Sequence, residues 1–166
     1  MKKFILSITC SLFALLSFTL ITPSTAEAAS QVPDSRIVSE YFEQLEDGSY
    51  FHVIISEELT SSVSRSIQTK TGSRKITFYN ADGTALWVFT LHGTFQYIPG
   101  SSATCTSSSY TINIYDDSWE NTAASTTTSG NQAIGDATFI KKVLFITTNI
   151  ENVHATLTCS AYGTLS

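Results

Sequence analysis

Hydrophobic and polar residues alternate along much of the chain, and the clearest case lies between Thr84 and Ile98. The residues of one parity form an aromatic stripe of Trp87, Phe89, Leu91, Phe95 and Tyr97, while the other parity carries Val88, Thr90, His92, Thr94 and Gln96. Strict alternation of this kind is typical of a half-buried β-strand. Gly93 completes the apolar series and indicates a bulge or a bend. We therefore predict one long strand whose aromatic face lies in the core.

The same alternation recurs in shorter segments towards the C-terminus. Strands are predicted over 110–114, from Trp119 to about Ser129, and over 153–159. Residues 133–148 fit one long strand or two short ones, with Lys141-Lys142 as a turn or a solvent-facing edge, and residues 149–152 are expected to turn the chain. Cys159 shares the parity of Val153, Ala155 and Leu157, so we expect its side chain in the core.

The N-terminal part of the pattern admits two interpretations. Residues 37–45 fit a helical stripe, yet Asp47-Gly48 is a strong two-residue hairpin turn and residues 50–55 are aromatic and β-branched. We favour a hairpin of residues 38–45 against 50–56. Residues 57–73 are polar and predict an exposed loop or a weak edge strand, and a strand follows over 75–79.

About eight strands with at most one helix predict an all-β fold, an antiparallel β-sandwich. Trp119 follows Cys105 at about the immunoglobulin spacing, but Leu157 stands where that fold has a tyrosine two residues before its second cysteine. We therefore expect the sandwich to be immunoglobulin-like in architecture only.

The first 28 residues have the composition of a secretory signal peptide. Lys2 and Lys3 precede an apolar run over 4–21, and Ala26-Glu27-Ala28 supplies small residues for a signal peptidase. A retained membrane anchor, which needs about 20 apolar residues, is the less favoured alternative. We expect cleavage after Ala28 or Ala29, a flexible leader over 29–36, a single domain over 37–166, and a secreted protein with no membrane span after cleavage.

Cleavage changes how the cysteines are interpreted, because Cys10 is removed together with the apolar run. Cys105 and Cys159 remain, an even number in an oxidising compartment, and we predict one disulfide between them. Two unpaired buried thiols are the alternative.

The net charge after cleavage argues against several classes of partner. Loss of Lys2, Lys3 and Glu27 leaves seven basic and thirteen acidic residues, a net charge of about −6. Such a chain gains little binding free energy from neutralising phosphate groups, so nucleic-acid binding and electrostatic docking on anionic lipid are not expected.

Candidate chemistry is sparse, and no catalytic, cofactor or metal residue is predicted. The three histidines, His52, His92 and His154, fall in predicted strands without metal-ligand spacing, and Asp116-Asp117 fits a turn. A serine nucleophile motif is also missing from the residues after the apolar run. The alternating pattern does not assign Tyr115 and Trp119 to a buried or an exposed face. We select these two aromatic residues as candidate exposed contacts for a sugar or a peptide.

Several segments resemble a group of small secreted proteins of Gram-positive, mostly gut-type bacteria. The resemblance lies in residues 47–50, 83–87, 93–95, 118–119, 129–131 and 157–161, and in the Cys105/Cys159 pair. That group has no established activity, so the resemblance implies a secreted, disulfide-bonded β-domain and no catalytic residue.

These observations predict a non-enzymatic recognition module at the cell envelope or in the medium. Its expected partner is extracellular, an envelope glycan or a protein. The alternative from another class is a small secreted hydrolase whose site is assembled across strands, for which a pocket holding a histidine, a carboxylate and a serine within hydrogen-bond reach of one another would be the evidence.

Overall fold

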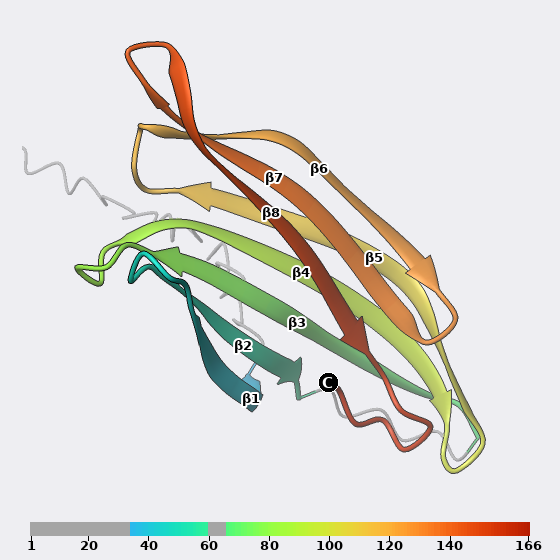
Figure 1. Ribbon diagram of the computed structural model, residues 1–166. Coiled ribbons are helices and arrows are strands. Elements are labelled where there is room, and N and C mark those ends of the chain that lie inside the picture. The colour runs from blue at the N-terminus through green and yellow to red at the C-terminus, as the bar shows by residue number, and fades with distance from the viewer. Residues whose placement is uncertain (1–33, 60–65) are drawn as a thin grey trace, which may run out of the picture. The chain divides into compact units, whose positions relative to one another are not determined.

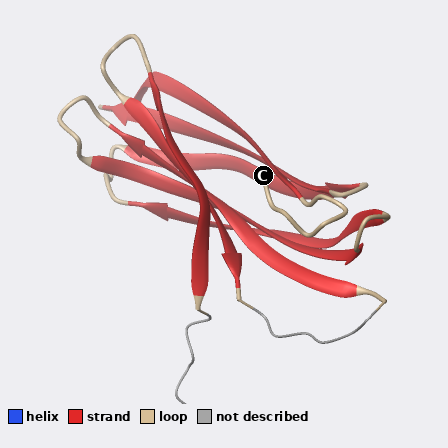
Figure 2. Ribbon diagram, turned by 90° about the horizontal axis from the view of Figure 1, so that it is seen from below, coloured by secondary structure: helices blue, strands red, loops and turns tan. Residues whose placement is uncertain are grey.

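Eight antiparallel strands make up the structure, a computed structural model that describes residues 34–59 and 66–166. The strands are β1 (Ser35–Gln44), β2 (Tyr50–Glu58), β3 (Gln68–Tyr79), β4 (Ala85–Ile98), β5 (Ser102–Ile114), β6 (Trp119–Ser129), β7 (Gln132–Val143) and β8 (Ile146–Thr158). They form one sheet in the order β1-β2-β3-β4-β5 and another in the order β6-β7-β8 (Figure 1). Strands and loops account for all the described residues, without a helix among them (Figure 2). The all-β prediction is confirmed.

The two sheets share one hydrophobic core. Four residues of the predicted aromatic stripe, Trp87, Phe89, Leu91 and Phe95, are fully buried on β4, and the inward parity predicted for β8 is also confirmed. Trp87 of the larger sheet stacks on Phe139 of the smaller one, with ring centroids 3.8 Å apart and planes 6° from parallel. This layered arrangement is the one that two antiparallel sheets adopt when each buries one face.

Large side chains of one sheet fit against small ones of the other. A Cβ atom at Gly135 on β7 would lie 3.0 Å from Leu91 Cδ1 and from Phe89 Cζ, and one at Gly93 on β4 would lie 2.8 Å from the ring of Phe95. The glycines therefore make room for the aromatic residues. The ladder between β4 and β5 shifts register between Thr94 and Phe95, so the bulge predicted from Gly93 lies beside it.

The connectivity is simpler than that of an immunoglobulin domain. Within each sheet, every strand pairs with its neighbours in sequence, and the chain passes between the sheets once, from β5 to β6. Immunoglobulin domains use Greek-key connections. The likeness therefore does not extend beyond two layers of antiparallel strands.

The ambiguous segment over 37–45 is a strand, and the predicted hairpin is confirmed as β1 against β2. Its turn differs in detail, because the Gly48 N–H donates to the Leu45 carbonyl and the Leu45 N–H donates to the Ser49 carbonyl. Gly48 has φ 86°, so three residues rather than two form the loop, ending in a left-handed glycine. β1 begins at Ser35, inside the predicted leader, while the signal peptide expected over 1–28 lies outside the described residues.

Three other predictions are wrong in their boundaries. Residues 68–73 belong to β3, a central strand, and Glu57 at the end of β2 is buried rather than exposed. The chain does not turn at Lys141-Lys142 or at 149–152, because the β7–β8 turn consists of Leu144 and Phe145. Neither residue is a usual turn former, so residue preferences do not indicate a turn at this position.

Candidate functional site

The two cysteines lie on either side of the β6–β7 turn. The Cys105 N–H donates to the Gly130 carbonyl at 2.8 Å, and the Cys159 N–H donates to the carbonyl of the next residue, Asn131, at 3.0 Å. Both are buried, as predicted for Cys159, and both are free thiols in the structure, so the predicted disulfide is not formed there and the arrangement is that of the alternative, two unpaired buried thiols. Burial raises the pKa of each thiol, and Cys105 adds to the rise at Cys159. A raised pKa disfavours the thiolate, so neither cysteine has the properties of a nucleophile.

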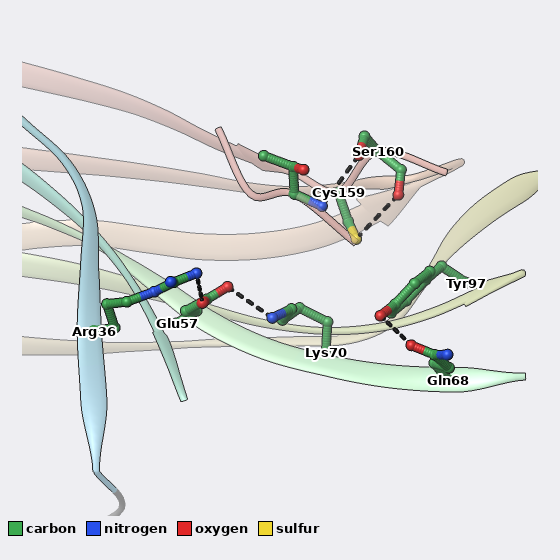
Figure 3. Close-up of polar contacts among 8 residues, drawn as sticks. Arg36, Glu57, Gln68, Lys70, Tyr97, Cys159 and Ser160 are labelled. Atoms are coloured by element: carbon green, nitrogen blue, oxygen red, sulfur yellow. Dashed lines mark hydrogen bonds and ion pairs between the residues drawn. The ribbon is translucent and has the colours of Figure 1, made fainter. Parts of the chain in front are cut away.

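A buried carboxylate, Glu57, lies between two cations (Figure 3). Glu57 accepts a hydrogen bond from Lys70 at 2.7 Å and another from Arg36, and its side chain is 5% exposed. The hydrogen bond from Lys70 lowers the pKa of Glu57, burial opposes that shift, and Arg36 lowers it further. This arrangement satisfies a buried charge and leaves no free acid or base, which indicates a structural role.

Of the two aromatic candidates, one is exposed and the other is not. Tyr115 is 61% exposed in the β5–β6 loop, as predicted. Trp119 is 4% exposed, so its selection as a surface contact is wrong. As the first residue of β6 it faces inward and packs edge-on against Phe78, with ring centroids 5.5 Å apart.

Asp116 accepts a hydrogen bond from the Ser118 N–H at 2.9 Å, which is the turn predicted there.

A serine, an aspartate and a histidine meet in one row on the outer face of the smaller sheet. Asp136 pairs across the ladders with Ser125 on one side and His154 on the other, and all three line a shallow pocket. His154 Nδ1 lies 2.7 Å from Asp136 Oδ1. A catalytic triad needs the histidine between the serine and the acid. Here the aspartate is in the middle, so this row does not activate Ser125.

Four aromatic side chains gather elsewhere, on the outer face of the larger sheet, where one of them is exposed and the other three are half-buried. We call Phe42, Tyr50, His52 and Tyr79 the aromatic cluster. Its rings form two stacks: Phe42 on His52, with centroids 4.3 Å apart and planes 11° from parallel, and Tyr50 on Tyr79, at 4.9 Å and 9°. The register explains the stacks, because Phe42 pairs with His52 across β1–β2 and Tyr50 pairs with Tyr79 across β2–β3.

Phe42 is the outermost ring of the cluster and is 64% exposed. His52 stacks on one of its faces, and β1 is an edge strand of the sheet, so among the described residues no strand lies beside β1 on its other side. Glu40 also contacts His52, with its Oε1 2.7 Å from the His52 Nε2. The free face of Phe42 is thus presented in a fixed orientation.

A groove of 330 Å³ adjoins this ring, lined by Phe42, Gln44, Gly48, Tyr50 and Ala81. It lies between the β1–β2 turn and the β3–β4 turn, where a Cβ atom at Gly48 would come within 3.2 Å of the Ala81 methyl group. Its volume is at the lower end of the range for small-molecule sites, about 300–1,000 Å³. The groove combines an aromatic wall with an amide side chain.

Sequence reasoning missed this cluster, although the signal for it was present. The hairpin around Asp47-Gly48 fixes which residues of β1 and β2 are opposite one another, and the buried parity of Val53 and Ile55 puts Tyr50 and His52 on the other face. The missing step was to assign faces to a hairpin whose existence was itself in doubt.

Within the described residues, no group of three or more histidine, cysteine, aspartate or glutamate side chains is placed to hold a metal ion. Over the same residues, no helix is long and apolar enough to cross a membrane. Comparison with known proteins finds no matching family model, no matching curated protein and no matching solved structure.

Proposed function

We propose that the protein is a secreted, non-enzymatic recognition module that binds a glycan of the cell envelope through the aromatic cluster. The observation that carries this proposal is the ring of Phe42, 64% exposed and stacked on one face only. Large apolar rings are seldom left uncovered on a surface without a binding role when they gather with others. A sugar ring has an apolar face of C–H groups that packs on such a ring.

The surroundings of Phe42 suit a polyhydroxylated ligand. Gln44 lines the same groove and offers both donors and acceptors to hydroxyl groups, and Tyr50 adds a phenolic oxygen. Glu40 beside His52 adds an acceptor at the edge of the cluster. The acidic net charge disfavours a polyanion, so the proposed ligand is a glycan without dense negative charge.

We further propose that Cys105 and Cys159 form a disulfide in the secreted protein, in the manner of the small secreted proteins that the sequence resembles. Their approach to consecutive residues of one turn supports this pairing, and so does the burial of both thiols. A bond there would join β5 of one sheet to the end of β8 in the other. It would act as a staple of the fold and not as a redox centre.

The test is retention of the protein, collected after export and N-terminally sequenced, on insoluble peptidoglycan and on neutral polysaccharides. We expect retention on at least one of these polymers, and at least a tenfold loss for Phe42→Ala. Tyr162→Ala is the control, because it removes another exposed ring that lies outside the cluster. Equal retention of both variants, or none for the unaltered protein, would refute the glycan proposal. Cleavage of a polymer during the assay would favour the hydrolase instead.

A further inference from the structure

The end of the β7–β8 hairpin exposes four consecutive apolar residues, Val143, Leu144, Phe145 and Ile146, which we call the hairpin tip. Leu144 is 86% exposed, Phe145 is 99% exposed, and Val143 and Ile146 are 48% and 67% exposed. Trp119, the first residue of β6, pairs with Lys141, so the hairpin continues past the end of its neighbouring strand (Figure 1, orange-red). No other strand of the smaller sheet accompanies the tip.

The turn at the tip has a conformation that its residues do not favour. Leu144 has φ 49° and Phe145 has φ 69°, both in the left-handed region. A two-residue hairpin turn needs positive φ at both positions, and Asn-Gly meets that need with little strain. The fold would thus be served better by a polar pair. Strain of this kind persists at sites where the side chains have another task.

Polar residues flank the tip on both strands of the hairpin, at a defined distance from its apex. Lys141 and Lys142 precede Val143, and Thr147 and Thr148 follow Ile146 on the opposite strand. Lys142 anchors the hairpin, since its N–H donates to the Ser118 carbonyl and its Nζ donates to Glu120. At about 3.3 Å per residue, the lysines lie roughly 10 Å from the apex. An apolar apex backed by lysine at that distance matches the order of acyl chains and phosphate groups at a membrane surface.

The size of the tip argues for lipid and against a protein partner. A stable protein interface buries about 800 Å² on each side, more than four residues at a convex apex supply. A lipid surface needs no complementary shape, only apolar side chains that reach the acyl boundary. The backbone is also suited to it, because Val143 and Ile146 pair within the hairpin. Net acidity does not oppose this mode, since insertion is driven by apolar contact and not by charge.

From these observations we propose that the hairpin tip inserts into the interfacial region of a phospholipid bilayer and holds the protein reversibly at a membrane surface. Leu144 and Phe145 enter the acyl boundary, and Lys141 and the Lys142–Glu120 ion pair lie at the level of the phosphates. This site is separate from the aromatic cluster and does not depend on glycan binding.

The test is co-flotation of the exported, N-terminally sequenced protein with vesicles of pure phosphatidylcholine. We expect the unaltered protein to float with the vesicles and the double variant L144N/F145G to show at least a tenfold lower bound fraction. Because Asn-Gly suits the turn, this variant should melt at the same temperature as the unaltered protein or higher. Tyr162→Ala, which removes another exposed ring far along the chain from the tip, is the control and should float normally.

Phe145→Trp gives an independent measurement that does not rely on loss of binding. Its emission should shift to the blue when vesicles are added, since Trp87 and Trp119 are already buried and report little change. The proposal is overturned by flotation of L144N/F145G equal to that of the unaltered protein, or by no flotation and no shift. A tip-dependent dimer in sedimentation velocity would also overturn it and would assign the tip to a second copy of the chain.

Discussion

The two faces of the larger sheet carry aromatic residues in opposite circumstances. On the inner face Trp87, Phe89 and Phe95 are fully buried, and Trp87 stacks on Phe139 of the other sheet. On the outer face Phe42 stacks on His52 within its own sheet and is otherwise exposed. The same class of side chain thus holds the sheets together on one face and is free for a ligand on the other.

The difference follows from strand parity and position in the sheet. Inner positions of β4 lie opposite small residues such as Gly135 and Ala133, which leave room for large rings. Phe42 lies on the edge strand β1, and the ring contacts that the structure shows for it are with His52 and Tyr50 of its own sheet. Substitutions on the inner face should therefore change stability, and substitutions on the outer face should change binding.

Trp87→Ala should have the largest effect on stability. It removes a fully buried indole from the contact with Phe139 and leaves a cavity between the sheets. We expect the free energy of unfolding to fall by about 3–5 kcal/mol, measured by chemical denaturation. A loss below about 1 kcal/mol would mean that the sheets are not held together at this contact.

Reduction of the proposed disulfide should come next. A bond between Cys105 and Cys159 closes a loop of about 55 residues, so its loss should cost about 2–4 kcal/mol. Cys105→Ser/Cys159→Ser and the reduced protein should have the same lowered stability, and thiol counting on the exported protein should find no free thiol. Two reactive thiols in the exported, unfolded protein would contradict the pairing.

Gly93→Ala should have an intermediate effect. The new Cβ atom would lie 2.8 Å from the buried ring of Phe95 and 3.1 Å from the Ala133 methyl group, and neither neighbour has free space to move into. We expect a loss of about 1–3 kcal/mol in the free energy of unfolding. Gly130→Ala is the comparison, because a Cβ atom there meets nothing within 4 Å, although its φ of 55° carries its own strain.

A smaller effect is expected from acid. The pKa of Glu57 is lowered in the folded protein by Lys70 and Arg36, so the folded state favours the ionised form. The stabilisation is present above the ordinary value of about 4.5 and is lost as pH falls through the lowered folded pKa. Glu57→Gln should flatten the decline of melting temperature between pH 5 and acid unfolding. An unchanged decline would assign the acid sensitivity to other carboxyl groups.

The smallest effect on stability is expected for Phe42→Ala. An exposed ring that contacts only its own sheet contributes little, so the free energy of unfolding should change by no more than about 0.5 kcal/mol. If stability instead falls by an amount close to that for Trp87→Ala, Phe42 is part of the core and the two faces do not differ as described.

Parity was sufficient to predict much of the fold. The β4 stripe, the inward side of β8, the β1–β2 hairpin and the limits of β6 all follow from alternation and turn residues, because these depend on local chemistry. The β7–β8 turn could not be predicted in this way. Leu144 and Phe145 adopt left-handed conformations that their side chains disfavour, so a rule based on preference places the turn at the wrong residues.

The candidate site was harder to predict from the sequence than the fold. Trp119 and Tyr115 were selected because parity left them unassigned, but burial depends on which sheet faces each residue, and Trp119 packs against Phe78 of the other sheet. Phe42 and Tyr50 become neighbours only through the register of a hairpin and the position of β1 at the edge. Such tertiary relations are not present in any short segment of sequence.

The most direct test of glycan recognition at the outer face is a titration of the isotopically labelled protein with a soluble fragment of the retained glycan, followed by two-dimensional NMR. We expect shifts confined to Phe42, Gln44, Tyr50 and the two turns beside them, with the inner-face residues unchanged. Shifts centred on Ser125, Asp136 and His154, or on the hairpin tip, with none at Phe42, would contradict the proposed role of the aromatic cluster.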